Sequence, residues 1–417
     1  MNRKVRKMKK TLAMLLSLVM VCSMAFGLTA CGKKANDDPI KIGHLCDLTG
    51  VESMTGQEAK EAMDNAVKYI GEICGRKIEV YHQDTKSDAS AAVDAARTLV
   101  DTYDVDIIFG PSLIGHKGAI ANWAQEAQVP VIYYNPTPEM MIKDNDWVIG
   151  TAGANPQMPT AIADYVYNEL GWRKVVTLTK DDTGGKSYMD PFVANFEAMG
   201  GEVLAQAWAP SSDNTDYASY LTQLVPYADE ADGMIAWTSA GNAIQLWNVW
   251  YSMGLHEKLP ITACFHGAFT DSFVCDALAG QNPDLVNEIL GSIAPMTWGY
   301  NLENEACQAF VEWYKENNDG AYPIANNLPT ATVDALSVLA AAVESLDGDT
   351  SDKAALHDAI LKVNIAGCEG GTSFAEGANI ANKDIHICKV VQLENGQYHY
   401  EVVKSYESVP VSGLTVG

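Results

Sequence analysis

The chain has 417 residues, which is more than one hydrophobic core usually organises, so we expect more than one domain. Apolar residues make up 47% of it, which argues against a disordered chain because there is ample side-chain surface to bury. The formal net charge of −25 repels phosphate backbones, so we expect no nucleic-acid partner.

The chain opens with a basic stretch and a long apolar run. Residues 1–10 carry several Arg and Lys side chains and no acidic ones, and residues 12–30 are almost entirely apolar. A basic region followed by an apolar one is the pattern of an export signal. The run is also nearly as long as the roughly 20 residues that span a bilayer, so a retained membrane anchor is the competing interpretation.

Cys31 follows this run directly. The residues Leu28-Thr29-Ala30-Cys31 resemble the lipobox of bacterial lipoproteins, whose cysteine is acylated and whose precursor is cut just before it. The resemblance implies a lipoprotein signal peptide at residues 1–30, lipid on Cys31, and a tether at residues 31–36. An ordinary helix cysteine is the alternative. We expect an extracytoplasmic (or periplasmic) protein, anchored to the outer face of the cell membrane by lipid, and multiple acyl chains would hold it firmly.

Two α/β units are predicted next, because apolar runs typical of strands alternate with segments of helical periodicity. In the first unit, strands are expected at residues 40–50, 77–84, 105–111 and 129–135, and helices at 57–73, 89–103 and 118–128. In the second unit, helices are expected at 158–171, 189–201, 217–228 and 241–254, and strands at 174–182, 202–210, 232–239 and 259–265. Residues 384–403 read as two strands joined at Asn395-Gly396, a good hairpin signal. The fold class is therefore α/β, with parallel sheets covered by helices.

Known catalytic and metal motifs are incomplete in this chain. Residues 183–187, TGGKS, lack the first glycine of a phosphate loop because Lys180 stands there, so we expect a glycine-rich turn. Residues 110–115, GPSLIG, lack the second glycine of a nucleophile elbow, since Ile114 stands there. The segment at His256 lacks the second histidine of a zinc protease helix. Nothing here requires catalysis, so we predict no enzyme.

Seven cysteines remain when Cys22 and Cys31 are set aside. They form no CxxC pair and no Cys/His cluster of zinc spacing, so no metal site is predicted. Their odd number leaves at least one unpaired within the molecule, and each is otherwise expected to be a small buried apolar residue. The seven are Cys46, Cys74, Cys264, Cys275, Cys307, Cys368 and Cys388.

Six segments, in order, resemble the leucine/isoleucine/valine-binding family, the type I solute-binding proteins of ABC transporters. They are the opening strand and Leu-Thr-Gly loop at residues 40–50, then 75–100, 105–115, 129–140, 307–318 and 330–346. The resemblance covers residues 40–401. It implies two Rossmann-like lobes joined by a three-strand hinge, with a ligand cleft between them. Lobe 1 would take residues 37–152 plus 298–384, and lobe 2 residues 153–297 plus 385–417.

Candidate solute contacts lie just after the strands, where open parallel sheets bind ligands. Several family features are altered at these positions: a serine is replaced by Ile114, and an acidic residue by Phe265-His266. These changes argue against a plain α-amino acid as the solute. A slot lined by the aromatic candidates would suit an aromatic ring or a cationic group of the solute. Core packing of the rings is the alternative for each aromatic residue, and loop capping for each polar one. The candidates are Ser112, Leu113, Ile114, Tyr133, Tyr134, Asn135, Thr137, Trp237, Thr238, Phe265, His266 and Trp298.

The resemblance implies a protein that captures a small organic solute, such as an amino acid, an amide or an aromatic or cationic relative, and delivers it to ABC permease subunits. It implies no cofactor, and we expect a monomer. A receptor of the same fold that feeds a membrane sensor is the first alternative, and an enzyme on this scaffold is the second.

Overall fold

The computed structural model divides the chain into residues 1–36 and a compact unit at residues 37–417. It describes residues 38–50, 52–112, 114–139, 142, 145–210, 215–265, 272–323 and 325–412. Within these ranges, no helix combines the length and the apolar character needed to cross a bilayer. The predicted signal peptide, tether and lipidated Cys31 lie outside the described residues.

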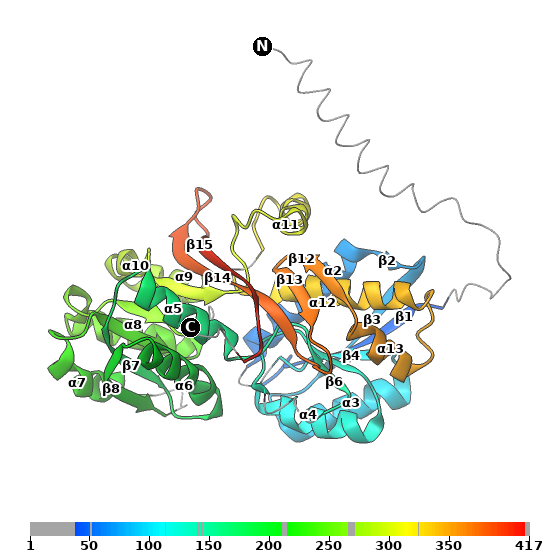
Figure 1. Ribbon diagram of the computed structural model, residues 1–417. Helices are drawn as coiled ribbons and strands as arrows, with labels where there is room; N and C mark the ends of the chain where they lie inside the picture. The colour runs from blue at the N-terminus through cyan, green and yellow to red at the C-terminus, as the bar shows by residue number, and fades with distance from the viewer. Residues whose placement is uncertain are drawn as a thin grey trace, which may run out of the picture. The chain divides into compact units, whose positions relative to one another are not determined.

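The first sheet is built from the amino-terminal part of the unit (Figure 1). Its strand order is β2 (Glu72–Ile73), β3 (Arg76–Asp84), β1 (Ile40–Cys46), β4 (Ile107–Phe109), β5 (Val131–Tyr133) and β6 (Val148–Gly150). β1 pairs with β3 and β4 in parallel, as do β4 with β5 and β5 with β6, while β2 pairs with β3 antiparallel. Helical crossovers between these parallel strands cover both faces of the sheet.

Successive side chains along the strands of this sheet pack alternately in two separate apolar cores. Ile107 and Phe109 of β4 pack with Ile132 of β5 in one core, and Ile108 packs with Val131 in the other. This is the period of two that a strand imposes on its side chains. A strand that is apolar at every position therefore buries side chains in both cores.

Helices cover the two faces in sequence-distant groups. α2 (Ser53–Ile70), α12 (Leu328–Ser345) and α13 (Lys353–Ile360) contribute to the first core, and α3 (Ala89–Tyr103) and α4 (Ile114–Ala127) to the second. Figure 1 shows α3 and α4 together on one side of this sheet. The start of α3 follows from Asp88, whose carboxylate accepts a hydrogen bond from the Ala91 amide as an N-cap.

The second sheet has the order β10 (Ile261–Ala263), β9 (Gly233–Trp237), β7 (Lys174–Lys180) and β8 (Glu202–Ala209), all paired in parallel. The surrounding helices share one apolar core with it. They are α5 (Gln157–Asn168), α6 (Thr183–Ala198), α7 (Tyr217–Leu224), α8 (Ala240–Ser252), α9 (Ser272–Gln281) and α10 (Pro283–Ile289).

A third, antiparallel sheet has the order β11 (Ile293–Met296), β14 (Ala381–Gln392), β13 (Gly370–Phe374) and β12 (Asn364–Gly367), with β15 (Tyr398–Val409) also paired to β14. α11 (Glu305–Asn317) precedes α12 in the chain. β14 belongs to both halves of the unit: Lys383 contacts α12, whereas Ile387 and Cys388 pack in the core of the second sheet. The predicted hairpin at Asn395-Gly396 is confirmed, and Gly396 has the positive φ of +90° that this turn requires.

The structure differs from the predicted elements in several places. The strands β2, β6, β11, β12 and β13 were not predicted, because each is five residues or shorter and lacks clear alternation. β2 lies within the predicted helix 57–73, which ends at Ile70 as α2, and the helices α9, α10 and α13 were not predicted either. The predicted glycine-rich turn at residues 183–187 is wrong: these residues form the first turn of α6, since Asp182 caps the Gly185 amide. The helix predicted at 118–128 begins earlier, at Ile114.

All seven cysteines left for the folded part are free thiols in the structure. Six are buried, as expected for small apolar side chains, and Cys74 is exposed.

Candidate functional site

At the carboxyl ends of β4 and β5, the side chains of Lys117, Asn135 and Thr137 meet the main-chain oxygen of Ser112. The Asn135 amide nitrogen donates to the main-chain oxygen of Ser112 at 2.7 Å, which joins the two loops that follow these strands. Lys117, from the first turn of α4, donates to Oδ1 of Asn135 at 2.7 Å and to Oγ1 of Thr137 at 2.6 Å. Three of the predicted residues, Ser112, Asn135 and Thr137, therefore form one network, and Lys117 organises it.

Lys117 is fully buried, and the contacts described for its ammonium group are with uncharged oxygens and a ring. Besides the two side chains above, Nζ donates to the main-chain oxygens of Asn135 and Pro136. Burial holds the pKa of Lys117 well below its usual value. The Tyr133 ring lies 5.1 Å from Nζ and adds a cation–π contact. Because burial disfavours the charged form of Lys117, a negatively charged group close to this network would stabilise its ammonium.

Ser112 adds an unused polar group at this edge. Its Oγ is buried and has no hydrogen-bond partner among the described residues. Buried hydroxyls in folded proteins are nearly always hydrogen-bonded, so such an atom marks a place where a further polar group is accommodated. The hydroxyl lies in the loop directly after β4, where parallel sheets present ligand contacts.

The neighbouring loop after β1 is held by Asp47. Its Oδ1 accepts hydrogen bonds from the Thr85 hydroxyl at 2.5 Å and from the Ser87 amide at 3.1 Å, and Nδ1 of His116 lies 3.5 Å from it. Within the described part of the chain, Oδ2 of Asp47 has no hydrogen-bond partner. Buried polar groups thus line the carboxyl ends of three adjacent strands.

Tyr133 and Tyr134 are adjacent in sequence and point to opposite faces of the first sheet. Tyr133 packs in the core of α3 and α4, and its hydroxyl donates to the Lys117 main-chain oxygen at 2.6 Å. Tyr134 packs in the core of α2 and α12, and its hydroxyl lies 2.8 Å from Nε2 of His44. Both rings are fully buried, so the two do not line a common slot.

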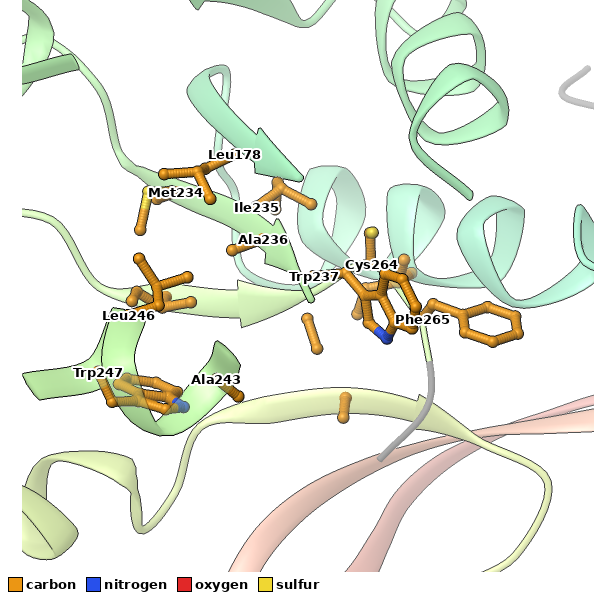
Figure 2. Packing of buried hydrophobic residues seen from close by; sticks show 14 of the residues in the cluster. Leu178, Met234, Ile235, Ala236, Trp237, Ala243, Leu246, Trp247, Cys264 and Phe265 are labelled. Atoms are coloured by element: carbon orange, nitrogen blue, oxygen red, sulfur yellow. The ribbon is translucent and has the colours of Figure 1, made fainter. Parts of the chain in front are cut away.

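The carboxyl ends of β9 and β10 carry a compact aromatic cluster, which we call the Trp237 cluster: Tyr188, Trp237 and Phe265. Figure 2 shows Trp237 beside Phe265, and their ring centroids lie 6.0 Å apart. Tyr188 of α6 stacks on Phe265 at 3.7 Å and meets the Trp237 ring edge-on at 4.6 Å. Such ring pairs add about 0.5–1.5 kcal/mol each beyond their burial. Nζ of Lys180 lies 5.5 Å from the Trp237 ring, so one cation already faces the cluster.

Thr238 and Trp298 have other surroundings. The Thr238 hydroxyl is buried and lies 3.0 Å from the Tyr217 hydroxyl, although Thr238 directly follows Trp237 in the chain. Trp298 packs in a small separate group with Cys307 and Val311, and its indole nitrogen donates to the Asn326 main-chain oxygen at 2.8 Å. The structure therefore unites Trp237 and Phe265 and leaves Trp298 apart from them.

Other predicted positions lie outside the described residues. These are Leu113, His266 and the side chain of Ile114, together with Cys31. The contact of every predicted residue with a solute stays a prediction.

Sequence reasoning missed Lys117 and Tyr188. Lys117 falls between a predicted loop and a predicted helix, so neither the strand-end rule nor helical periodicity selects it. Tyr188 lies beside the segment that was expected to be a turn, and it becomes visible once Asp182 is read as a helix cap. Asp182, an aspartate of the kind that commonly caps helix starts, was the available signal.

Comparison with known proteins assigns a family to this arrangement. A family model described as periplasmic binding protein matches residues 39–397. A Leu/Ile/Val-binding protein homologue from Brucella melitensis is 21% identical over 381 residues, which cover 90% of this chain and 94% of the relative.

Solved structures agree with the fold. An ABC transporter substrate-binding protein from Sphaerobacter thermophilus has a TM-score of 0.79 at 26% identity and covers 89% of this chain and 98% of its own. An ABC transporter solute-binding protein from Rhodopseudomonas palustris, in complex with 3,4-dihydroxybenzoic acid, has a TM-score of 0.77 at 21% identity, covering 90% and 99%. The predicted fold class, two Rossmann-like lobes with parallel sheets and a three-strand hinge, is confirmed. The chain belongs to the periplasmic binding protein family, among the type I solute-binding proteins of ABC transporters that include the Leu/Ile/Val-binding proteins.

Proposed function

We propose that this protein is an extracytoplasmic lipoprotein that captures a small organic solute and delivers it to the permease of an ABC importer, without making or breaking a covalent bond in the solute. The solute would be bound between lobes close to the predicted ones, residues 37–152 plus 298–384 and residues 153–297 plus 385–417. The protein would work as a monomer carried on the membrane by the lipid of Cys31.

The polar network of Ser112, Lys117 and Asn135 carries this proposal. It lies at the carboxyl ends of two adjacent parallel strands, and it holds a buried hydroxyl without a partner in the described chain. Open α/β sheets bind ligands at this edge. The buried ammonium of Lys117 favours a solute with a carboxylate or another electron-rich group.

The Trp237 cluster supports an aromatic or cationic part of the solute. Trp237 and Phe265 lie at the carboxyl ends of the second sheet, and Thr238 follows directly. An aromatic carboxylic acid suits both halves of such a site, because its ring stacks on aromatic faces and its anion suits buried donors. The relative with 3,4-dihydroxybenzoic acid bound is of this ligand class, and the Leu/Ile/Val-binding relatives keep aliphatic amino acids among the candidates.

A thermal-shift screen of the purified protein tests the function. Aliphatic amino acids, aromatic acids, amides and quaternary amines are compared at equal concentration, and a ligand at 100 times its Kd is expected to raise stability by about 2.7 kcal/mol. We expect the strongest shift from an aromatic acid, with the solute recovered chemically unchanged. Turnover of the solute, or no shift from any class, would contradict the proposal.

The anchor is tested separately with Cys31→Ser. We expect this variant to be lost from the membrane fraction of the producing cells, since an acylated residue is removed. Unchanged retention would mean that the apolar run at residues 12–30 itself holds the protein.

A further inference from the structure

Two adjacent strands place three metal-ligating side chains on one face of the first sheet. His44 and Cys46 lie two residues apart on β1 and so point to the same face, and His82 of β3 is the register partner of His44. One ligand atom from each of the three lies within 4.8 Å of the others. Two imidazoles and a thiol are a donor set typical of Zn²⁺ sites.

The histidines are oriented by further hydrogen bonds. Nε2 of His82 lies 3.0 Å from Oδ1 of Asp64 on α2, and Nε2 of His44 lies 2.8 Å from the Tyr134 hydroxyl. An ionised carboxylate only accepts hydrogen bonds, so His82 carries a proton on Nε2 and presents the lone pair of Nδ1 to His44. A histidine held by a carboxylate through its second nitrogen is the usual arrangement around protein-bound metals.

We propose that His44, Cys46 and His82 form a Zn²⁺ site, with Nδ1 of each imidazole and the thiolate as ligands and one position left for water. The two Nδ1 atoms lie 2.8 Å apart, which is closer than two nitrogens on one tetrahedral Zn²⁺, whose bonds of about 2.0–2.1 Å set them roughly 3.3 Å apart. The site therefore forms when the imidazoles separate by about half an ångström, and His82, the partly exposed ring of the two, is the one that would shift.

Metal binding releases one proton and moves another. The Cys46 thiol releases its proton to solvent as the Zn–S bond forms. The single proton of neutral His44 moves from Nδ1 to Nε2, so that Nδ1 binds the ion and Nε2 donates to the Tyr134 oxygen. Cys46 directly precedes the loop that Asp47 holds, so a bound ion would stiffen one of the loops at the carboxyl edge of the sheet.

Without metal, the same side chains form a hydrogen-bonded relay. The Tyr134 hydroxyl donates to His44, His44 donates to His82, and His82 donates to Asp64. The relay and the metal site predict different responses to Zn²⁺, so titration separates them.

The experiment is a Zn²⁺ titration of the purified protein in chelator-treated buffer, with Co²⁺ absorption as a probe for thiolate ligation. We expect one Zn²⁺ per chain, a Co²⁺–thiolate band that Cys46→Ala abolishes, and an affinity at least 100-fold lower in His82→Asn. Asp64→Asn keeps all three ligands and should weaken binding 10–100-fold. Cys74→Ser, which removes the exposed thiol, is the control and should bind as the parent does.

Circular dichroism of each variant shows whether it folds, and His82→Asn is the conservative choice because its side chain is partly exposed. Absence of Zn²⁺ binding by the parent would overturn the site and leave the relay as its structural role. Binding that survives Cys46→Ala and His82→Asn, or that disappears only in Cys74→Ser, would also overturn it.

Discussion

Lys117 donates hydrogen bonds to both oxygens of Asn135, to Oδ1 at 2.7 Å and to the main-chain oxygen at 3.1 Å. The lysine is fully buried, and the network that it organises includes three of the predicted solute-contact residues, Ser112, Asn135 and Thr137. A single side chain outside the predicted set thus fixes the shape of the loop after β5.

Lys117→Met is expected to loosen this loop. Oδ1 of Asn135 and Oγ1 of Thr137 lose their donor, whereas the Asn135 main-chain oxygen still accepts from the Thr137 hydroxyl. Each buried acceptor left unpaired costs about 1–3 kcal/mol. We expect the free energy of unfolding to fall by about that amount and the solute affinity to fall at least tenfold, measured by urea denaturation and calorimetry. The control is Lys68→Met on the exposed end of α2, which should change stability by less than about 0.5 kcal/mol. Unchanged affinity in Lys117→Met would separate this lysine from the solute site.

Trp237→Phe and Trp298→Phe form a matched pair for the aromatic part of the site. The first alters a ring at the carboxyl end of β9, and the second removes an indole hydrogen bond to Asn326 inside a separate buried group. We expect Trp237→Phe to weaken solute binding several-fold, and Trp298→Phe to lower stability by about 1–3 kcal/mol with little change in affinity. Equal losses of affinity in both variants would show that the two rings share the site.

Lys383→Met should be strongly destabilising. Its ammonium lies 3.3 Å from Asp334 and 3.4 Å from Glu369, and all three groups are buried. Burial lowers the pKa of Lys383, but the two carboxylates outweigh this effect and hold it above its usual value. Removing the cation leaves buried carboxylates uncompensated, which costs about 3–5 kcal/mol.

The matched control is Lys389→Met, which breaks the partly exposed ion pair with Glu401 at 2.6 Å and should cost less than about 1 kcal/mol. Adding Glu369→Gln to Lys383→Met should recover part of the loss, because one buried negative charge is removed. Similar urea midpoints for the two lysine variants would contradict this account.

His386 and His399 should make the protein less stable in mild acid. Burial lowers the pKa of each to about 4, although the Glu369 and Pro323 main-chain oxygens that face them act in the opposite direction. The unfolded chain titrates near pH 6.5, so between about pH 6.5 and 4 it binds protons that the folded protein does not. Stability is therefore fully present above pH 6.5 and falls by up to about 1.4 kcal/mol per histidine per pH unit below it.

Urea denaturation at pH 7 and pH 5 measures how the free energy of unfolding changes with pH. His399→Gln should reduce this change by the contribution of one histidine. Charged Asp384 and Lys383 also face His386, and the rings of Trp298, Tyr300 and Tyr322 surround His399. Glu369 acts against the slope, since burial raises its pKa and its protonation in acid stabilises the fold. The same slope in His399→Gln as in the parent would contradict this prediction.

Gly185→Ala tests why two glycines open α6. A Cβ at Gly185 would lie 2.0 Å from the Lys180 main-chain oxygen, whereas one at Gly184 would meet only a side-chain oxygen at 3.2 Å. We expect Gly185→Ala to lower stability by about 1–3 kcal/mol through overpacking and Gly184→Ala to be nearly neutral. Thermal denaturation of the two variants would refute the steric explanation if their midpoints matched.

Local pattern was enough for most of the secondary structure. The helix predicted at residues 89–103 is α3 residue for residue, because an Ala-rich amphipathic segment begins at a capping aspartate. Apart from the three-residue β6, the parallel strands of both sheets were found because buried strands are continuous apolar runs. Short strands such as β12 were missed, since their stability comes from partners distant in the chain rather than from their own residues.

The edge proposed for the site follows from the same pattern, but the set of side chains that meet there does not. Strand ends identify the edge where Ser112, Asn135, Thr137, Trp237 and Phe265 lie, because parallel strands end together. Which side chains meet there depends on the face of the sheet to which each side chain points and on which helices pack against that edge. The period of two sends Tyr133 and Tyr134 into opposite cores, and α4 brings Lys117 to the loop after β5.

The pairing register of strands distant in the chain determines further contacts, such as that between His44 and His82. His44 and His82 are 38 residues apart in the chain, and no spacing rule joins them, but the pairing of β1 with β3 sets their ring nitrogens 2.8 Å apart. Family, fold class and the ligand-facing edge can be read from periodicity and motif order, because these properties are local. The buried lysine, the split pair of tyrosines and the His–Cys–His group arise from long-range packing, which only the folded chain creates.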